Sequence, residues 1–339
     1  MRFEKVALLG LECVDAPEVI PSSAIVQELS GTFDRLGIRQ DILESVAGIR
    51  SRRFWKEGTM PSDAATMAAK KVLDITQVDR DRIGLLINSS VCRDYLEPST
   101  ACLVHGNLGL PAGCLNYDLG NACLAFLNSM EMASAMIEAG SIDYALIVDG
   151  ESSRSITEAT VKRLQAEETT LEDVHSQFAS LTLGSGAVAM ILARADLHPE
   201  CTHRFLGGVS LAATEHRNLC RGVVDWMVTN TKKLLGAGIE LASKTWCLAQ
   251  SELGWSCEAL DVLILHQVSQ VHTASLLQAL GLDPDRALLT FPEFGNVGPA
   301  SVPMALAKAL EVGKIDTGQR IALMGIGSGL NCTFSEVVW

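Results

Sequence analysis

Cys123 is the residue whose type and place best suit covalent chemistry. It follows Asn121 and precedes the apolar stretch 124–139, which has the period of a buried helix and stops at Gly140. We therefore expect Cys123 at or just before the first turn of a long helix. The free N–H groups and partial positive charge there favour a thiolate, lower the pKa of a cysteine and can bind the oxyanion formed when the thiolate attacks a thioester. A free cysteine is usually just a small buried hydrophobe, and the chain has ten, so partners must support this role.

Two other polar residues stand where catalytic partners of a cysteine would stand. His266 follows the apolar run VLIL, at the strand end where an open α/β sheet binds its ligands, and Asn296 lies between Gly295 and Gly298. A lone histidine after a strand is more often structural, and asparagine between glycines is usually a turn former. Together, a neutral imidazole N–H and an amide can donate to one carbonyl oxygen and stabilise an enolate. This combination favours carbon–carbon bond formation over hydrolysis.

A glycine-rich stretch, GIGSGLNC, follows the last apolar run. Glycines after a strand leave backbone N–H groups free and allow a close approach, so we expect the N–H of Gly329 to complete an oxyanion hole with that of Cys123. Ser328 in the same stretch is a candidate contact to the substrate. The stretch lacks the βαβ unit and the later acidic residue of a dinucleotide site, which excludes a Rossmann motif.

These residues need an α/β scaffold, and four apolar runs of strand length supply it. Runs that are apolar on both faces suit central strands covered by helices. The four runs are Ile83 to Asn88, Tyr144 to Asp149, Val262 to Leu265 and Ile321 to Met324.

The runs also recur in order, with DRIGLLINSS resembling DVLILHQVS and IDYALIVDGE resembling GQRIALMGIGSG. We therefore predict two related α/β halves, residues 1–190 with the nucleophile and residues 205–339 with His266, Asn296 and the glycine-rich loop. The seam falls between Leu181 and Gly208. Residues 152–180 read as an amphipathic helical insertion, for which a plain surface excursion is the alternative.

Composition narrows the class of protein. The chain has 339 residues, 48% of them hydrophobic and 20% charged, which is enough for a large core. The cysteines show no CxxC pair and no zinc-ligand spacing, so we expect no metal and no disulfide framework. The first apolar run is too short for a signal peptide or membrane span, which predicts a reducing, cytoplasmic location without a transmembrane segment. A net charge of -13 disfavours nucleic acid and anionic membranes as partners.

A phosphate-bearing substrate would need a local cluster of cations. Two groups of basic residues qualify, although an ordinary solvated face is an equally good interpretation of each. The first group is Arg50, Arg52, Arg53 and Lys56, and the second is Arg217, Arg221, Lys232 and Lys233.

Seven motifs in register resemble the thiolase superfamily, in its β-ketoacyl-acyl-carrier-protein synthase III branch and closest to the olefin-biosynthesis thiolases of the OleA type. They cover essentially the whole chain. In order, they are GIRSRRFW, RDYLEPSTA, NACLAF, LTLGSGA, LHQVS, FGNVGPASVP and GIGSGLN.

The resemblance implies a five-layered αβαβα thiolase fold, a homodimer, and Cys123, His266 and Asn296 as the catalytic triad. It implies a non-decarboxylative, head-to-head Claisen condensation of two long-chain fatty acyl-CoA thioesters, through an acyl-cysteine, to a 2-alkyl-3-ketoalkanoic acid. No cofactor other than the coenzyme A of the substrates is implied. Further enzymes of an olefin, ketone or β-lactone pathway are possible partners.

Glu97, in the motif YLEPST, discriminates between reactions. Decarboxylative relatives obtain their enolate by losing carbon dioxide and carry an apolar residue at the matching place. Two acyl-CoA substrates require a base for the α-proton, and the resemblance implies that Glu97 reaches into the partner subunit's site to supply it. The alternative is that Glu97 merely caps the turn before Pro98.

Other functions stay open at the level of sequence. One is a decarboxylative synthase III that uses malonyl-acyl carrier protein, and another is an aldol enzyme resembling 3-hydroxy-3-methylglutaryl-CoA synthase. A third is a non-catalytic subunit, which the retained cysteine, histidine, asparagine and glutamate disfavour. The Trp and Arg with which synthase III enzymes hold the nucleotide of CoA fall on Ile42 and Val46 here, so the donor can be CoA or acyl carrier protein.

Overall fold

Nine strands form the main sheet of the computed structural model, which describes residues 1–339. Five belong to the first part of the chain and lie in the order β5-β4-β6-β7-β1, and four belong to the second part and lie in the order β11-β12-β13-β8. The two sets join at the edge pair Ala7–Arg204. The strands of the first set are β1 (Val6–Asp15), β4 (Ile83–Asn88), β5 (Leu115–Asp118), β6 (Tyr144–Glu151) and β7 (Gly186–Arg194), and those of the second are β8 (Arg204–Ala212), β11 (Val262–Leu265), β12 (Arg320–Gly327) and β13 (Asn331–Val338).

The two sets repeat one pairing pattern. In the first, β4 is parallel to β6, and β6, β7 and β1 follow antiparallel. In the second, β11 is parallel to β12, and β12, β13 and β8 follow antiparallel. The segments whose sequences resemble each other, β4 with β11 and β6 with β12, hold equivalent places in this pattern. The boundaries 1–190 and 205–339 stay a prediction; the first set ends at Arg194 and the second begins at Arg204.

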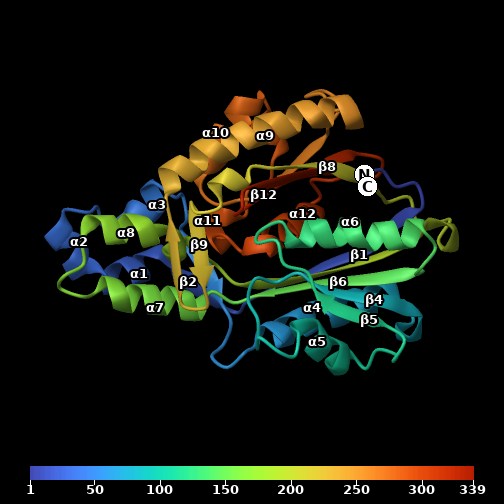
Figure 1. Cartoon of the computed structure of the whole chain (residues 1–339), viewed down its shortest axis with the longest axis horizontal. Coiled ribbons are helices and arrows are strands. Elements are labelled where there is room, and N and C mark those ends of the chain that lie inside the picture. Colours follow the sequence, from blue (N-terminus) through green and yellow to red (C-terminus); the bar gives the residue numbers. More distant parts are fainter.

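Helices cover both outer faces and fill the space between the two sheets (Figure 1). One outer layer holds α9 (Thr231–Leu253) and α10 (Gln270–Leu280), the other holds α4 (Pro61–Thr76) and α5 (Thr100–Leu108), and the central layer holds α6 (Ala125–Glu138) and α12 (Ser301–Glu311). Each interface has its own hydrophobic cluster, the largest around α6 and α12. The predicted αβαβα thiolase fold is confirmed.

The alternation of side chains along the strands decides which residues face the central layer. In β6, Ala145 and Ile147 belong to the central cluster, while Leu146 and Val148 belong to the outer one. Side chains two residues apart share a face. The same alternation directs the last side chains of β6 toward α6. In β11, Ile264 belongs to the central cluster, so His266, two residues later, faces the central layer as well.

A smaller lobe flanks one end of the layers (Figure 1). It contains the predicted insertion, which forms two helices, and a β-hairpin that packs against them. No helix of the chain has both the length and the apolarity to cross a membrane. The elements not yet placed are α1 (Ser22–Glu28), α2 (Ser30–Leu36), α3 (Ile42–Ser45), α7 (Arg154–Leu164), α8 (Leu171–Gln177), α11 (Phe291–Phe294), β2 (Glu18–Pro21), β3 (Ser51–Phe54), β9 (Cys220–Val223) and β10 (Trp226–Thr229).

Candidate active site

Cys123 occupies a tight turn immediately before α6, as its sequence context predicts. The N–H of Leu124 donates to the carbonyl oxygen of Asn121 at 3.0 Å, and Ala122 between them has a φ of 45°. A positive φ is uncommon for a residue with a Cβ and marks a turn that the surrounding structure holds in place. The turn leaves Cys123 half-buried beside the start of α6, where a helix has free N–H groups.

The end of β12 lies directly over this turn. A Cβ added at Gly327 would stand 3.3 Å from the carbonyl oxygen of Asn121, and one added at Gly325 would stand 2.5 Å from Leu124 Cδ2. Only glycine permits this approach. The glycine-rich segment of the second half is thereby brought against the nucleophile of the first half.

Several backbone N–H groups at this junction have no acceptor in any other residue, and two of them bear on the predicted chemistry. They are those of Cys123 and Gly329, the pair predicted for an oxyanion hole. Unpaired backbone donors are rare in folded proteins unless water or a ligand satisfies them. Ser328 beside them is half-buried, and its hydroxyl has no partner in the chain.

His266 lies at the end of β11, where its own N–H donates to Met324 O at 2.8 Å. The side chain is 3% exposed and its Nδ1 has no hydrogen-bond partner. Burial, with a smaller contribution from His272, lowers the pKa of His266 to about 3. The imidazole is therefore neutral at physiological pH, the form that can donate one N–H to a carbonyl oxygen.

Asn296 is fixed by backbone bonds on both sides. Its N–H donates to Thr182 O and its carbonyl oxygen accepts from Gly184 N–H, each at 2.9 Å. Its Oδ1 accepts from the N–H of Gly298 at 3.0 Å. Because the amide oxygen faces that donor, the NH₂ group points away from its own loop and is free to donate.

Comparisons with known proteins identify the family of the chain. The family model for 3-oxoacyl-[acyl-carrier-protein (ACP)] synthase III matches residues 117–207, and the model for its C-terminal part matches residues 250–339. The acyl-CoA:acyl-CoA alkyltransferase of Xanthomonas campestris is 50% identical over 339 residues, all of both chains, and that of Shewanella oneidensis is 33% identical over 350 residues, again all of both. The chain belongs to the synthase III family of the thiolase superfamily.

Solved structures support the same placement. The crystal structure of a cysteine variant of Xanthomonas campestris OleA superposes with a TM-score of 0.98 at 50% identity, covering 100% of this chain and 98% of that one. Another OleA variant, solved with bound lauric acid and lauroyl-CoA, has a TM-score of 0.97 at 50% identity and covers 99% of this chain and 100% of that one. This synthase III relative is therefore an acyltransferase of the OleA type.

The ionisation expected for the nucleophile is corrected by its surroundings. Burial, with smaller contributions from the neighbouring Cys220 and Glu151, raises the pKa of the Cys123 thiol to about 12. The predicted lowering of this pKa at the helix N-terminus is therefore wrong for the free enzyme, because loss of solvent outweighs the helix dipole. The resting nucleophile is a thiol that must lose its proton as it attacks.

A pair of buried acids beside the nucleophile escaped the sequence analysis. Asp149 and Glu151 end β6 on its central face; Asp149 Oδ2 accepts from the Ser89 hydroxyl at 2.6 Å and Glu151 Oε1 accepts from Val91 N–H at 2.6 Å. Burial raises the pKa of Asp149 and raises that of Glu151 to about 7. The alternation along YALIVDGE is the signal that would have found them, since it places both acids on the face of Ala145 and Ile147.

Glu97 is not brought to the site of its own chain. It is exposed on the loop between β4 and α5, beside Tyr95 and Leu96, which are 56% and 93% exposed. Its carboxylate makes no hydrogen bond, and Ser99 instead caps α5 by accepting from Cys102 N–H at 3.1 Å. A turn-capping role for Glu97 therefore has no contact to support it.

The first basic group is not a phosphate site as a whole. Arg52 is fully buried and donates to the Ser22 hydroxyl and to Leu181 O at 3.1 and 2.8 Å, while Arg50 pairs with Glu293 at 3.1 Å. Arg52 therefore has a structural role, because its guanidinium joins buried segments of the chain. In the second group, all four side chains are exposed around the base of the β9–β10 hairpin.

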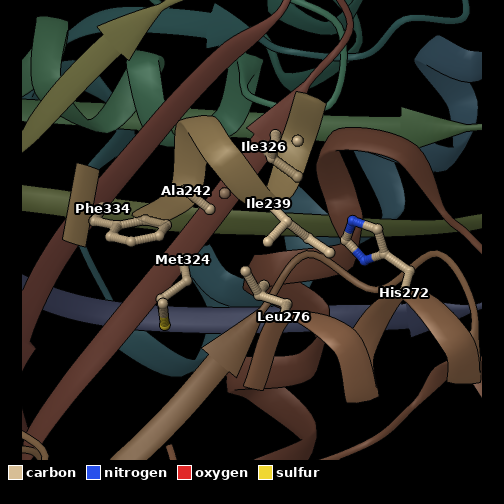
Figure 2. Close-up of a pocket in the computed structure, with 9 residues that line it drawn as sticks. Ile239, Ala242, His272, Leu276, Met324, Ile326 and Phe334 are labelled. Carbon is tan, nitrogen blue, oxygen red and sulfur yellow. The ribbon is translucent and has the colours of Figure 1, made fainter. Parts of the chain in front are cut away.

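A small cavity lies on the outer face of β12, away from Cys123. It measures about 10 Å³, room for about one water molecule, and Figure 2 shows the His272 imidazole pointing into it toward Ile239, with Met324 and Phe334 on the far side. Burial lowers the pKa of His272 to about 4, and its Nδ1 has no partner. This cavity backs β12, the strand that pairs with β11 before His266, and is too small for an acyl chain.

Proposed function

We propose that the enzyme joins two fatty acyl-CoA thioesters head to head in a non-decarboxylative Claisen condensation, giving a 2-alkyl-3-ketoalkanoic acid. The observation that carries the proposal is Glu97: a carboxylate without any partner in its own chain, beside the exposed apolar side chains of Tyr95 and Leu96 in an OleA-type acyltransferase. The relatives' name, acyl-CoA:acyl-CoA alkyltransferase, and the lauroyl-CoA bound to one of them support acyl-CoA as substrate.

In the first stage the Cys123 thiol attacks the carbonyl carbon of one acyl-CoA. The carbon–sulfur bond to Cys123 forms, the bond to coenzyme A breaks, and the thiol proton leaves with free coenzyme A. The negative oxygen of the tetrahedral intermediate accepts from the N–H groups of Cys123 and Gly329. Ser328, the residue before Gly329, is our candidate contact to the acyl group.

In the second stage the carbonyl oxygen of the other acyl-CoA accepts from His266 and the Asn296 amide. Glu97 of a second copy of the chain removes the α-proton, and the enolate attacks the acyl-Cys123 carbonyl. A carbon–carbon bond forms and the Cys123 sulfur leaves, regaining a proton. Water then cleaves the remaining thioester to the acid and coenzyme A, so that two acyl-CoA and one water give one β-keto acid and two coenzyme A.

A homodimer follows from this role of Glu97. The loop that carries Glu97 exposes the apolar side chains of Tyr95 and Leu96, and β5, with Leu115 52% exposed, is the edge strand of the sheet. Unpaired edge strands and exposed apolar loops are surfaces that second subunits cover. No cofactor enters the scheme; a cytoplasmic location and further pathway enzymes as partners stay predictions from the sequence.

The decarboxylative reaction with malonyl-acyl carrier protein is the second candidate, because the family models describe 3-oxoacyl-[acyl-carrier-protein] synthase III. One experiment separates the two. The purified enzyme is given myristoyl-CoA alone, and free coenzyme A and products are followed by mass spectrometry for wild type, Glu97→Ala and Cys123→Ala.

A two-chain β-keto acid, or the ketone it yields by losing carbon dioxide, is expected for wild type only. An acylated Cys123 that turns over only after malonyl thioester is added would instead establish the decarboxylative synthase and leave Glu97 without a catalytic role.

A further inference from the structure

A one-directional chain of side-chain amides runs from the glycine-rich loop through the nucleophile turn. Asn331 Nδ2 donates to Asn121 Oδ1 at 3.0 Å, Asn121 Nδ2 donates to Asn128 Oδ1 at 2.7 Å, and Asn128 Nδ2 donates to Glu131 Oε2 at 3.3 Å. Glu131 is 6% exposed, so the chain ends inside the protein. The acceptor at this buried end fixes which way each amide points.

The Asn331–Asn121 bond joins the two segments that carry the unpaired N–H groups. Asn331 opens β13 two residues after Gly329, and a Cβ added at Gly329 would stand 2.7 Å from its Nδ2. Asn121 lies two residues before Cys123. No other hydrogen bond connects residues 121–124 with residues 325–331.

This single link matters because the two donors belong to different halves of the chain. Donors that stabilise an oxyanion act only when both are held in place before the charge develops. Gly329 belongs to a glycine-rich loop and Cys123 to a turn, so neither helix nor strand hydrogen bonds fix their separation. Besides the packing of Gly325 and Gly327 on the turn, the side-chain bond is the one directional link between the segments.

We propose that the Asn121–Asn331 hydrogen bond is a positioning clamp that holds the N–H groups of Cys123 and Gly329 at the separation that one oxyanion requires. Both asparagines act through these backbone groups and touch no reacting atom. The inference rests on the proposed function, since it assumes that Cys123 is acylated by a thioester.

Two reactions of the same thiol test the clamp. Attack on the carbonyl of myristoyl-CoA passes through an oxyanion, whereas alkylation by iodoacetamide displaces iodide and does not. For Asn331→Ala and Asn121→Ala we expect the single-turnover rate of Cys123 acylation, measured as the first release of coenzyme A, to fall about 10–100-fold. The alkylation rate of Cys123 is expected to stay within about twofold, since the thiol itself is untouched.

Asn331→Asp keeps the shape of the side chain but replaces the donor with an acceptor that faces Asn121 Oδ1. It should slow acylation although, unlike the alanine variants, it leaves no cavity. The double variant Asn121→Ala/Asn331→Ala should be no slower than either single variant, because one bond is lost in all three. Thr333→Val is the matched control: it removes a 2.9 Å bond to Ser210 from the same strand and should leave acylation unchanged.

Acylation at the wild-type rate in the asparagine variants would overturn the clamp. An equal fall in acylation and alkylation would also overturn it, because the nucleophile turn itself would then have moved. If wild-type Cys123 is alkylated but never acylated, the proposed function fails and the clamp fails with it, an outcome distinct from both others.

Discussion

Glu151 is a buried residue whose charge state changes near physiological pH. It is 5% exposed, and burial raises its pKa from 4.5 to about 7. A carboxyl that binds its proton more tightly in the folded chain than in the unfolded chain costs stability as pH rises from about 4.5 through about 7. Glu151→Gln cannot ionise, and its amide oxygen still accepts the Val91 N–H.

We therefore expect Glu151→Gln to raise the free energy of unfolding at pH 8 by on the order of 1–3 kcal/mol, and to leave it nearly unchanged at pH 4.5. Urea unfolding at both pH values measures this. Glu138→Gln is the control, a carboxylate that also accepts backbone N–H groups, those of Glu4 and Lys5, but at the surface. An equal gain at both pH values would contradict a charge effect.

Glu151→Gln also tests whether the charge of Glu151 acts on the Cys123 thiol. Removing the Glu151 charge should lower the pKa of the Cys123 thiol, which that charge helps to raise. Alkylation of Cys123 by iodoacetamide at pH 8 should then be several-fold faster in Glu151→Gln, because the thiolate is the reactive form. A rate equal to that of wild type would show that burial alone governs the thiol.

Individual residues were predictable where local sequence fixes them. Cys123 before a helix, His266 after a strand and Asn296 between glycines follow from patterns a few residues long. The Asn121–Asn331 pair does not, because its members are 210 residues apart and each alone reads as a turn former. Arg52 looked like part of a solvated patch because local sequence does not show that its guanidinium meets Ser22 and Leu181.

At the scale of elements, the loop between β4 and α5 decides whether subunits cooperate. Leu96, beside Glu97, is 93% exposed in the single chain. If a second copy covers this loop, Leu96→Asp places a charge in an apolar interface and should weaken dimerisation at least tenfold, about 1.4 kcal/mol. Condensation activity should fall with it, because Glu97 no longer reaches its site.

Sedimentation velocity over a range of concentrations, together with the condensation assay, measures this. Ile75→Asp is the matched control, since Ile75 is 59% exposed on α4, away from the loop. A Leu96→Asp protein that is monomeric but fully active would show that Glu97 serves its own subunit or none.

Helices and strands with a clear pattern of apolar residues were predictable from the sequence, and those without one were not. The runs at β4 and β11 have the predicted bounds, β6 and β12 extend a few residues beyond theirs, and α6 ends beside Gly140 as its sequence indicates. The β9–β10 hairpin escaped prediction because its strands are four residues long and largely exposed, without the alternation that marks a half-buried strand.

For the whole molecule, the repeated strand order explains why the site lies between the halves. Equivalent strands β6 and β12 end at the same place, so the acids of the first half, the glycine-rich loop of the second and the helix α6 converge there. The internal similarity of the sequence indicated this duplication. It did not indicate which residues meet across the junction, because contacts between the two halves produce no repeating pattern in the sequence of either half.

The charge of the whole molecule makes the exposed cations at the β9–β10 hairpin important. A chain with a net charge of -13 repels the phosphates of coenzyme A. Arg221 follows Cys220, which is near enough to Cys123 to contribute to the raised pKa of that thiol, so this hairpin borders the site. We expect Arg221→Glu to raise the KM for myristoyl-CoA about tenfold with kcat nearly unchanged, an effect that shrinks as salt is added.

Lys70→Glu, on the exposed face of α4, changes the net charge equally and should leave KM unaltered. Equal changes in KM for both variants would assign the effect to overall charge and place the phosphates elsewhere.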